Sequence, residues 1–122
     1  MTMILVIDDE LSIVELLSTA LEEEGYQVMT AYNGQEGLAC LTTARPDVVV
    51  CDVMMPVLDG RDLCRSMQAD PRYRSIPIVL MSAIRKALSL TGCNYAALLE
   101  KPFELDDVLQ TIARLLPPDT SS

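Results

Sequence analysis

Four points along the sequence place a chemically active side chain where an apolar run of residues stops. They are the acidic pair Asp8-Asp9, the single carboxylate Asp52, the hydroxyl of Ser82 and the ammonium group of Lys101. Carboxylates that lie close together repel one another and take up protons unless a cation compensates them. Mg²⁺ suits such a set because it needs only one or two direct carboxylate ligands and keeps several waters. The set predicts Mg²⁺-dependent transfer of a phosphoryl group onto a carboxylate, with the hydroxyl and the ammonium group assisting.

Each of these residues also has an ordinary structural interpretation when it is taken alone. Asp9 could cap the helix that follows it, and Asp52 could open a turn. Ser82 could cap a helix, and Lys101 could be a solvated surface charge. The functional interpretation therefore depends on a fold that brings all four points together.

Short apolar runs alternate with amphipathic segments along the chain. The apolar runs predict strands at Met3–Ile7, Gln27–Tyr32, Asp47–Cys51, Ile76–Met81 and Tyr95–Leu99. Apolar positions with a helical period predict helices at Glu10–Glu24, Gln35–Thr43, Arg61–Ala69 and Glu104–Leu116. The stretch Ile84–Asn94 is not typical of a long helix, so a further helix there is expected to be short or shifted.

This alternation of strands and helices predicts an α/β fold with a parallel sheet covered on both faces. Right-handed crossovers favour a flavodoxin-like, doubly wound (βα)5 arrangement, with a five-stranded parallel sheet in strand order 2-1-3-4-5. Ligands of such sheets gather beyond the carboxyl ends of the strands. We therefore expect the four chemically active points to share one small cleft.

Composition restricts the classes of function that are open to the chain. Its 122 residues suffice for one domain, and 50% of them are hydrophobic. The net charge of −9 repels phosphate backbones and anionic lipid, so we expect neither direct nucleic-acid binding nor membrane association. The absence of histidine excludes histidine metal sites and a histidine phosphodonor in these residues. The start of the sequence has no pattern of a secretory leader, which favours a cytoplasmic protein.

The cysteines do not form a recognisable metal or redox motif. Their positions are Cys40, Cys51, Cys64 and Cys93, and none belongs to a C-x-x-C pair. We expect reduced, mostly buried thiols, because the core is large enough to be stable without covalent links. A secreted domain with two disulfides is the less favoured alternative.

Four longer motifs carry a resemblance to a known family. They are ILVIDDE (Ile4–Glu10), VVVCDVMMPVLDG (Val48–Gly60), PIVLMSA (Pro77–Ala83) and EKPFELDDVL (Glu100–Leu109). Through these four motifs the chain resembles the receiver domain of bacterial two-component response regulators. The resemblance implies a receiver domain over residues 1–116, followed at 117–122 by a tail or the start of a linker.

The resemblance also implies a role for each chemically active residue. Asp52 is expected to accept the phosphoryl group. Asp9, Asp52 and the backbone carbonyl of Met54 are expected to bind Mg²⁺ directly, with Asp8 acting mainly through a water. Ser82 and Lys101 are expected to contact phosphoryl oxygens. A cis peptide bond before Pro102 is also typical of the family.

The expected function is a phosphorylation-dependent switch and not a metabolic enzyme. The resemblance implies a phosphohistidine donor on a sensor histidine kinase or phosphotransfer protein, and an unknown downstream output protein or domain. The sequence leaves open whether phosphorylation makes the domain form a dimer. Met54 and Ile84 would flank the phosphoryl group and cannot orient a water, so self-dephosphorylation is expected to be slow.

The chain departs from the family pattern at its last strand. Receiver domains usually have Tyr or Phe three residues before the lysine, and Leu98 stands there. Ser82 and Lys101 are also closer in sequence than the family pattern. These departures motivate an alternative, a receiver-like interaction module that acts without phosphorylation. A metal-dependent phosphatase with an aspartyl nucleophile is less favoured, because the D-x-D signature is absent.

Overall fold

The computed structural model describes residues 2–55, 57–83 and 93–116, which form a layered α/β domain. Its strands are β1 (Met3–Ile7), β2 (Gln27–Ala31), β3 (Val48–Asp52), β4 (Ile78–Ser82) and β5 (Ala97–Glu100). The helices among the described residues are α1 (Leu11–Glu23), α2 (Gly34–Thr43), α3 (Gly60–Ala69) and α4 (Leu105–Leu115). None of these helices combines the length and apolar character that a membrane crossing requires.

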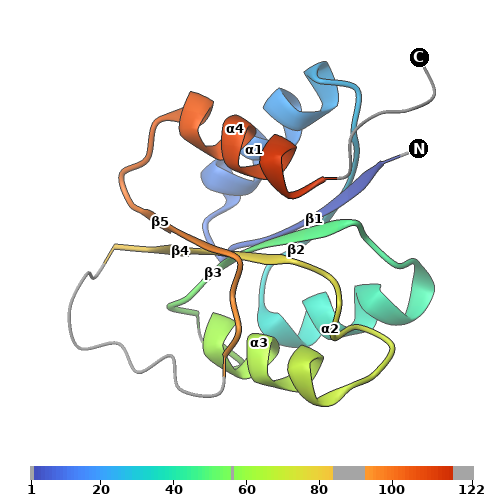
Figure 1. Ribbon diagram of the computed structural model, residues 1–122. Coiled ribbons are helices and arrows are strands. Elements are labelled where there is room, and N and C mark those ends of the chain that lie inside the picture. Colours follow the sequence, from blue (N-terminus) through green and yellow to red (C-terminus); the bar gives the residue numbers. More distant parts are fainter. Residues whose placement is uncertain (1, 56, 84–92, 117–122) are drawn as a thin grey trace.

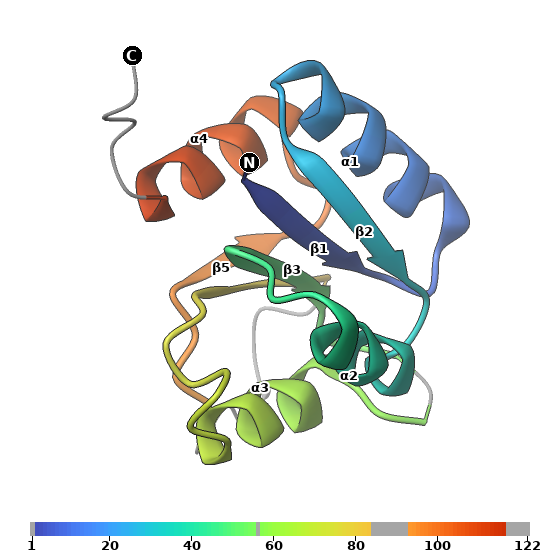
Figure 2. The same ribbon diagram turned by 90° about the vertical axis from the view of Figure 1, so that its right-hand side faces the viewer.

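The sheet has the predicted topology. All neighbouring strands pair in parallel, in the order β2-β1-β3-β4-β5. Helices α1 and α4 cover one face, and α2 and α3 cover the other (Figure 1). The turned view shows the arrowheads of β1 and β2 pointing the same way (Figure 2). The expected short helix in Ile84–Asn94 falls mainly on residues outside the described part of the chain, as does the expected tail at 117–122.

The sheet separates two packed cores because successive side chains of a strand point to opposite faces. On β1, Leu5 and Ile7 belong to the cluster under α2 and α3, whereas Ile4 and Val6 belong to the cluster under α1 and α4. Every residue of β3 and β4 is buried, which explains why both strands are apolar up to their last residues, Asp52 and Ser82. This rigid double-sided packing fixes where the strand ends lie.

The first residues of α3 are held by a capping box. Asp59 is the N-cap and accepts hydrogen bonds from the backbone N–H groups of Arg61 and Asp62, at 2.9 and 3.1 Å. Asp59 therefore satisfies backbone N–H groups in the first turn of α3 that have no partner within the helix. The alternative role of Asp9 as a helix cap is not observed: Glu10 is the N-cap of α1, and no side chain caps that helix.

The expectation of reduced thiols is wrong for two of the four cysteines. Cys64 on α3 and Cys93 before β5 form a disulfide, with their Cα atoms 5.4 Å apart. Cys40 and Cys51 are free, and Cys51 is buried. Spacing along the chain could not indicate this pair, because the two residues meet only when α3 packs beside the chain leading into β5.

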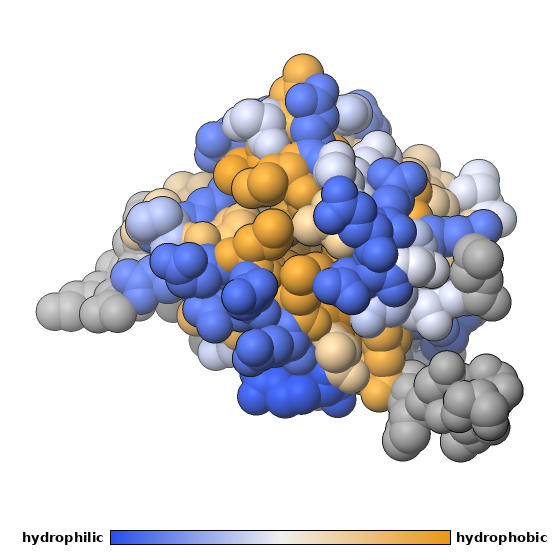
Figure 3. Space-filling view, turned by 90° about the horizontal axis from the view of Figure 1, so that it is seen from above, coloured by the Kyte–Doolittle hydropathy of each residue, from blue (hydrophilic) through white to orange (hydrophobic). Residues whose placement is uncertain are grey.

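Apolar side chains also gather on the outer surface over α1 and α4. The space-filling view from above shows them between groups of hydrophilic residues (Figure 3). Part of this surface is a shallow pocket lined by the apolar residues Ile13, Leu16 and Phe103. The charged residues Glu10 and Lys101 also line it. The pocket therefore adjoins the carboxyl end of the sheet, where the polar residues of the candidate site lie.

Candidate functional site

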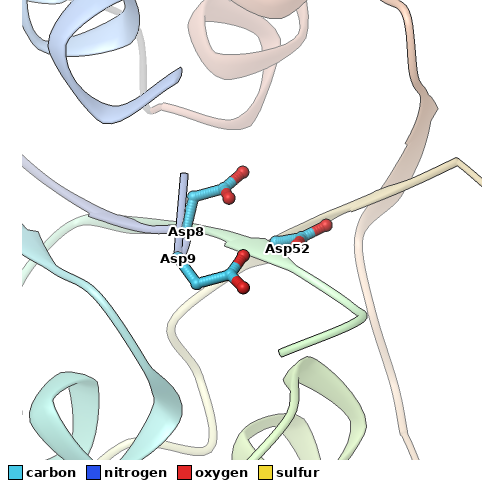
Figure 4. A group of neighbouring side chains, drawn as sticks. All are labelled: Asp8, Asp9 and Asp52. Carbon is cyan, nitrogen blue, oxygen red and sulfur yellow. The ribbon is translucent and has the colours of Figure 1, made fainter. Parts of the chain in front are cut away.

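Three carboxylates meet at the carboxyl end of the sheet. Asp8 and Asp9 directly follow β1, and Asp52 is the last residue of β3, the strand that pairs with β1. One carboxylate oxygen of each lies within 4.8 Å of the others. Figure 4 shows Asp8 and Asp9 leaving the end of β1 in opposite directions, with their carboxylates turned toward Asp52. Asp8 and Asp52 are buried, whereas Asp9 is exposed.

Lys101 supplies a positive charge to this cluster. Its Nζ lies 2.9 Å from Asp8 Oδ2, 3.2 Å from Asp52 Oδ1 and 3.6 Å from Glu10 Oε1. The backbone N–H of Lys101 donates to the carbonyl of Ser82 at 2.8 Å, which anchors the residue beside the end of β4. The expected convergence of Lys101 with the aspartates is thus present.

Glu10 is a neighbour of Lys101 that the sequence did not single out. Its carboxylate is largely exposed, and the 3.6 Å contact with Nζ is longer than those of Asp8 and Asp52. An acidic residue before a helix is common, so its type and position alone carried no signal.

The electrostatics of the cluster differ between its members. Burial and then the negative charge of Asp8 raise the pKa of Asp52 from 3.8 to about 6, against the opposing effect of Lys101. Burial lowers the pKa of Lys101, but its bonds to Asp8 and Asp52 outweigh this and leave the pKa raised. Lys101 therefore stays charged at neutral pH, while one added cation would relieve the repulsion between the carboxylates.

Ser82 and Met54 lie at the margins of the carboxylate cluster. Ser82 is the last residue of β4 and is buried, one residue beyond Met81, the register partner of Asp52. Met54 follows Asp52 by two residues, and 47% of its surface is exposed. Ile84, the other residue expected to flank the phosphoryl group, lies outside the described residues. The Lys101–Pro102 peptide bond is cis, as the sequence motif implies.

The loop between β3 and α3 approaches the backbone of Asp52 closely. The N–H of Gly60 donates to the carbonyl of Val53 at 2.9 Å. A Cβ on Gly60 would lie 2.5 Å from the Asp52 carbonyl oxygen, so any larger residue would push α3 away from the site. Glycine at this position lets the first turn of α3 pack against the strand end.

The donor set fits a divalent cation. Carboxylate oxygens are the ligands that Mg²⁺ prefers, and three of them surround one small volume. Lys101 compensates part of their charge but contributes only a single positive charge. Asp8, Asp9 and Asp52 could therefore hold a divalent metal.

A comparison with family models decides the class of the protein. Residues 4–113 match the model described as response regulator receiver domain. The chain belongs to the receiver domain family. This is not one of the conventional enzyme families but a family of two-component signalling.

Curated relatives extend this receiver domain into longer proteins. The "DNA-binding dual master transcriptional regulator RpaA" of Synechocystis is 34% identical over 119 residues, which are 95% of this chain and 49% of that protein. The "Response regulator PleD" of Caulobacter vibrioides is 44% identical over 81 residues, 66% of this chain and 18% of that protein. The chain spans about half the length of the first of these relatives.

Solved receiver structures share the fold of this chain. The receiver domain of a histidine kinase from Syntrophus aciditrophicus has a TM-score of 0.90 and 30% identity, covering 100% of this chain and 95% of that one. TrrA of Thermotoga maritima, solved in complex with Mg²⁺ and BeF, has a TM-score of 0.83 and 33% identity, covering 95% of this chain and 100% of that one. A relative with the same fold thus holds Mg²⁺.

Proposed function

We propose that this receiver domain is a signalling switch that accepts a phosphoryl group on Asp52 in a Mg²⁺-dependent reaction. The main support is that carboxylate oxygens of Asp8, Asp9 and Asp52 lie within 4.8 Å of one another. Lys101 Nζ also lies 3.2 Å from Asp52 Oδ1. The proposed donor is a phosphohistidine on a sensor histidine kinase or phosphotransfer protein, the kind of partner that the family implies. The domain would then act as a switch in the cytoplasm. These residues do not specify the output protein or domain.

The proposed reaction exchanges one bond at phosphorus for another. The bond from phosphorus to the donor imidazole nitrogen breaks, and a bond from phosphorus to an Asp52 carboxylate oxygen forms. The imidazole keeps the electron pair of the broken bond and takes up a proton from solvent. Mg²⁺, when bound, supplies positive charge that offsets the charge of the phosphoryl oxygens.

The residues around Asp52 have distinct proposed roles. Asp9 and Asp52 bind Mg²⁺ directly together with the Met54 backbone carbonyl, and Asp8 acts mainly through a water. Ser82 donates its hydroxyl to one phosphoryl oxygen, and Lys101 pairs with another. Lys101 already lies between Asp8 and Asp52, so it needs little movement to reach an oxygen attached to Asp52.

The apolar pocket beside Lys101 is a suitable place for the donor protein to dock. Ile13, Leu16 and Phe103 offer apolar contacts next to Glu10 and Lys101, at the edge of the carboxylate cluster. A partner that covered this pocket would bring its phosphorylated side chain to the open side of the cluster. The charges of Glu10 and Lys101 would orient it.

Slow loss of the phosphoryl group is part of the proposal. The Met54 side chain near Asp52 is apolar and 47% exposed, so it can shield the phosphoryl group but cannot orient a water. Met54→Asn should shorten the lifetime of the phosphorylated protein, measured as the decay of the phosphorylated mass. An unchanged lifetime would contradict the shielding role of Met54.

A mass measurement tests the proposed phosphorylation. The protein is incubated with Mg²⁺ and acetyl phosphate and then weighed intact. One added phosphoryl group is expected for the wild type and for Asp107→Asn, an exposed carboxylate on α4, and none for Asp52→Asn. An adduct on Asp52→Asn, or no adduct on the wild type, would overturn the proposal.

The alternative is an interaction module that acts without phosphorylation. It is favoured by Leu98, which is 43% exposed on β5 where receiver domains usually have an aromatic residue. An exposed aliphatic side chain on an edge strand can contact a partner in any phosphorylation state. The absence of an adduct, together with the absence of Mg²⁺ binding, would support this alternative.

A further inference from the structure

A covalent bond joins two parts of the chain that lead into the carboxylate cluster from different directions. Cys64 lies on α3 and Cys93 lies just before β5, 29 residues later. Cys64 has no exposed surface, and Cys93 is 9% exposed. The chain leading into β5 starts beside α3 and rises to the edge of the sheet (Figure 1).

The arm through α3 ends at the backbone of Asp52. Cys64 is on the second turn of α3, and Gly60 at the start of the helix bonds the carbonyl of Val53 at 2.9 Å. The close approach of Gly60 to the Asp52 carbonyl leaves no free space between the helix and the strand end. A displacement of α3 would therefore shift the backbone of Asp52.

The arm through β5 ends at Lys101 and Ser82. From Cys93 the chain continues to Ala96, whose N–H donates to the carbonyl of Ile78 at 2.8 Å, and then along β5 in register with β4. At the far end Lys101 N–H donates to the Ser82 carbonyl at 2.8 Å. The loop that the disulfide closes contains all of β4, including Ser82.

We propose that Cys64–Cys93 is a reversible redox site that controls how fast Asp52 is phosphorylated, the oxidised protein reacting more slowly. This proposal rests on the proposed function in two ways: it needs Asp52 as the acceptor, and it places the protein among intracellular signalling proteins. Disulfides in such proteins are usually transient or redox-sensing and not structural. The free thiols Cys40 and Cys51 serve as internal references for it.

The redox step balances with a small disulfide as oxidant. The two thiols of Cys64 and Cys93 lose two electrons and two protons and form one S–S bond, while oxidised glutathione accepts them and leaves as two glutathione thiols. Reduction is the reverse, through a mixed disulfide with one protein sulfur. Cys93 is the more exposed of the two residues and is the expected point of attack.

The expected direction follows from what the bond restrains. Phosphorylation adds charge and acceptor oxygens at Asp52, and Ser82 and Lys101 must adjust to them. In the oxidised protein α3 and the start of β5 cannot separate, so fewer molecules reach the adjusted arrangement. Because the observed rate scales with the populated fraction of the competent state, reduction should raise it.

The first arm of the test measures the sulfur chemistry alone. Wild-type protein is equilibrated with mixtures of reduced and oxidised glutathione, denatured, treated with N-ethylmaleimide and weighed. Two labels are expected on the oxidised protein, on Cys40 and Cys51, and four on the reduced one. The change from two labels to four is expected in mixtures whose redox potential matches that of glutathione in the cytosol. Four labels under all mixtures, or two labels under all of them, would overturn the reversible site.

The second arm measures the coupling to Asp52. Oxidised and reduced protein receive Mg²⁺ and acetyl phosphate, and the phosphorylated mass is followed with time. The reduced protein should react at least about fivefold faster, the lower end of ordinary coupling between sites. Cys93→Ser should react like the reduced protein in either mixture, and Cys40→Ser should keep the redox dependence of the wild type. Equal rates in both redox states would overturn the coupling.

A third measurement separates this proposal from the proposed function. Hydrogen exchange of a β5 peptide is compared in the oxidised and the reduced protein without a phosphodonor. Faster exchange after reduction supports the restraint independently of phosphorylation. If neither protein forms an adduct, the proposed function and its coupling to the disulfide are both contradicted, and only the restraint remains. Equal exchange would overturn the restraint itself.

Discussion

Replacing Asp52 by asparagine should stabilise the metal-free protein. The folded-state pKa of Asp52 is about 6 against an ordinary value of 3.8, mainly because the carboxylate is buried and lies beside Asp8. Because the folded protein holds this proton more tightly than the unfolded chain, the ionised form opposes folding at neutral pH. The asparagine side chain has nearly the same shape without the charge, so Asp52→Asn removes this unfavourable contribution.

The size of the effect follows from the two pKa values. At about pH 7.5 the difference between 3.8 and about 6 corresponds to ~3 kcal/mol of lost stability. At about pH 5 the carboxylate is mostly protonated in the folded state, and the same linkage gives ~1.6 kcal/mol. The pKa of about 6 already includes the favourable effect of Lys101, so we expect a gain of up to ~3 kcal/mol for the variant near neutral pH.

Urea unfolding followed by circular dichroism measures this gain. In EDTA at about pH 7.5, Asp52→Asn should have the higher free energy of unfolding, and its advantage should shrink at about pH 5. Mg²⁺ should stabilise the wild type selectively and close the gap. Asp107→Asn serves as the control for loss of one exposed charge. If Asp52→Asn is no more stable than the wild type in EDTA, the charge of Asp52 does not oppose folding and the reasoning is refuted.

Three further predictions concern the loop, the metal and the disulfide. Val57 has a φ of +71° and is 80% exposed, so Val57→Gly should raise the free energy of unfolding by about 1 kcal/mol; a loss of stability in urea would contradict this strain. Mg²⁺ affinity, measured by calorimetry, should fall about tenfold per pH unit below the pKa of Asp52 near 6, and a flat profile would exclude proton competition at Asp52. Reduction of Cys64–Cys93 should lower the free energy of unfolding by ~3.6 kcal/mol for the separation of 29 residues, whereas an unchanged thermal midpoint would show that the bond stabilises nothing.

The fold was predictable because the strands carry a strong and simple signal. β3 is buried along its whole length, and its apolar run has no other suitable place in a domain of this size. The ends of β4 and β5 were less predictable. The expected strand at Ile76–Met81 is observed at Ile78–Ser82, and the one at Tyr95–Leu99 is observed at Ala97–Glu100. These limits are set by pairing between the two strands, which the residue types do not encode.

The composition of the candidate site was predictable for a related reason. In a parallel sheet the carboxyl ends of the strands share one edge, so Asp8, Asp9, Asp52 and Lys101 had to approach each other once the strand order was right. The raised pKa of Asp52 depends on burial and on distances to Asp8 and Lys101, which the sequence does not contain. The disulfide was missed for the same reason, since it depends on how α3 packs.

The alternation of side chains along β1 has a consequence for how the protein can change. Ile4 and Val6 pack with one group of helices, and Leu5 and Ile7 pack with the other, so the sheet is a wall between two separate compartments. The described apolar residues of the two compartments pack in separate clusters, so substitutions far apart in different compartments should combine nearly additively. The compartment under the docking pocket can therefore be remodelled for a new partner while the sulfur-bearing compartment stays as it is. The carboxylates lie at the ends of β1 and β3, next to both compartments, so a change in either one can reach them.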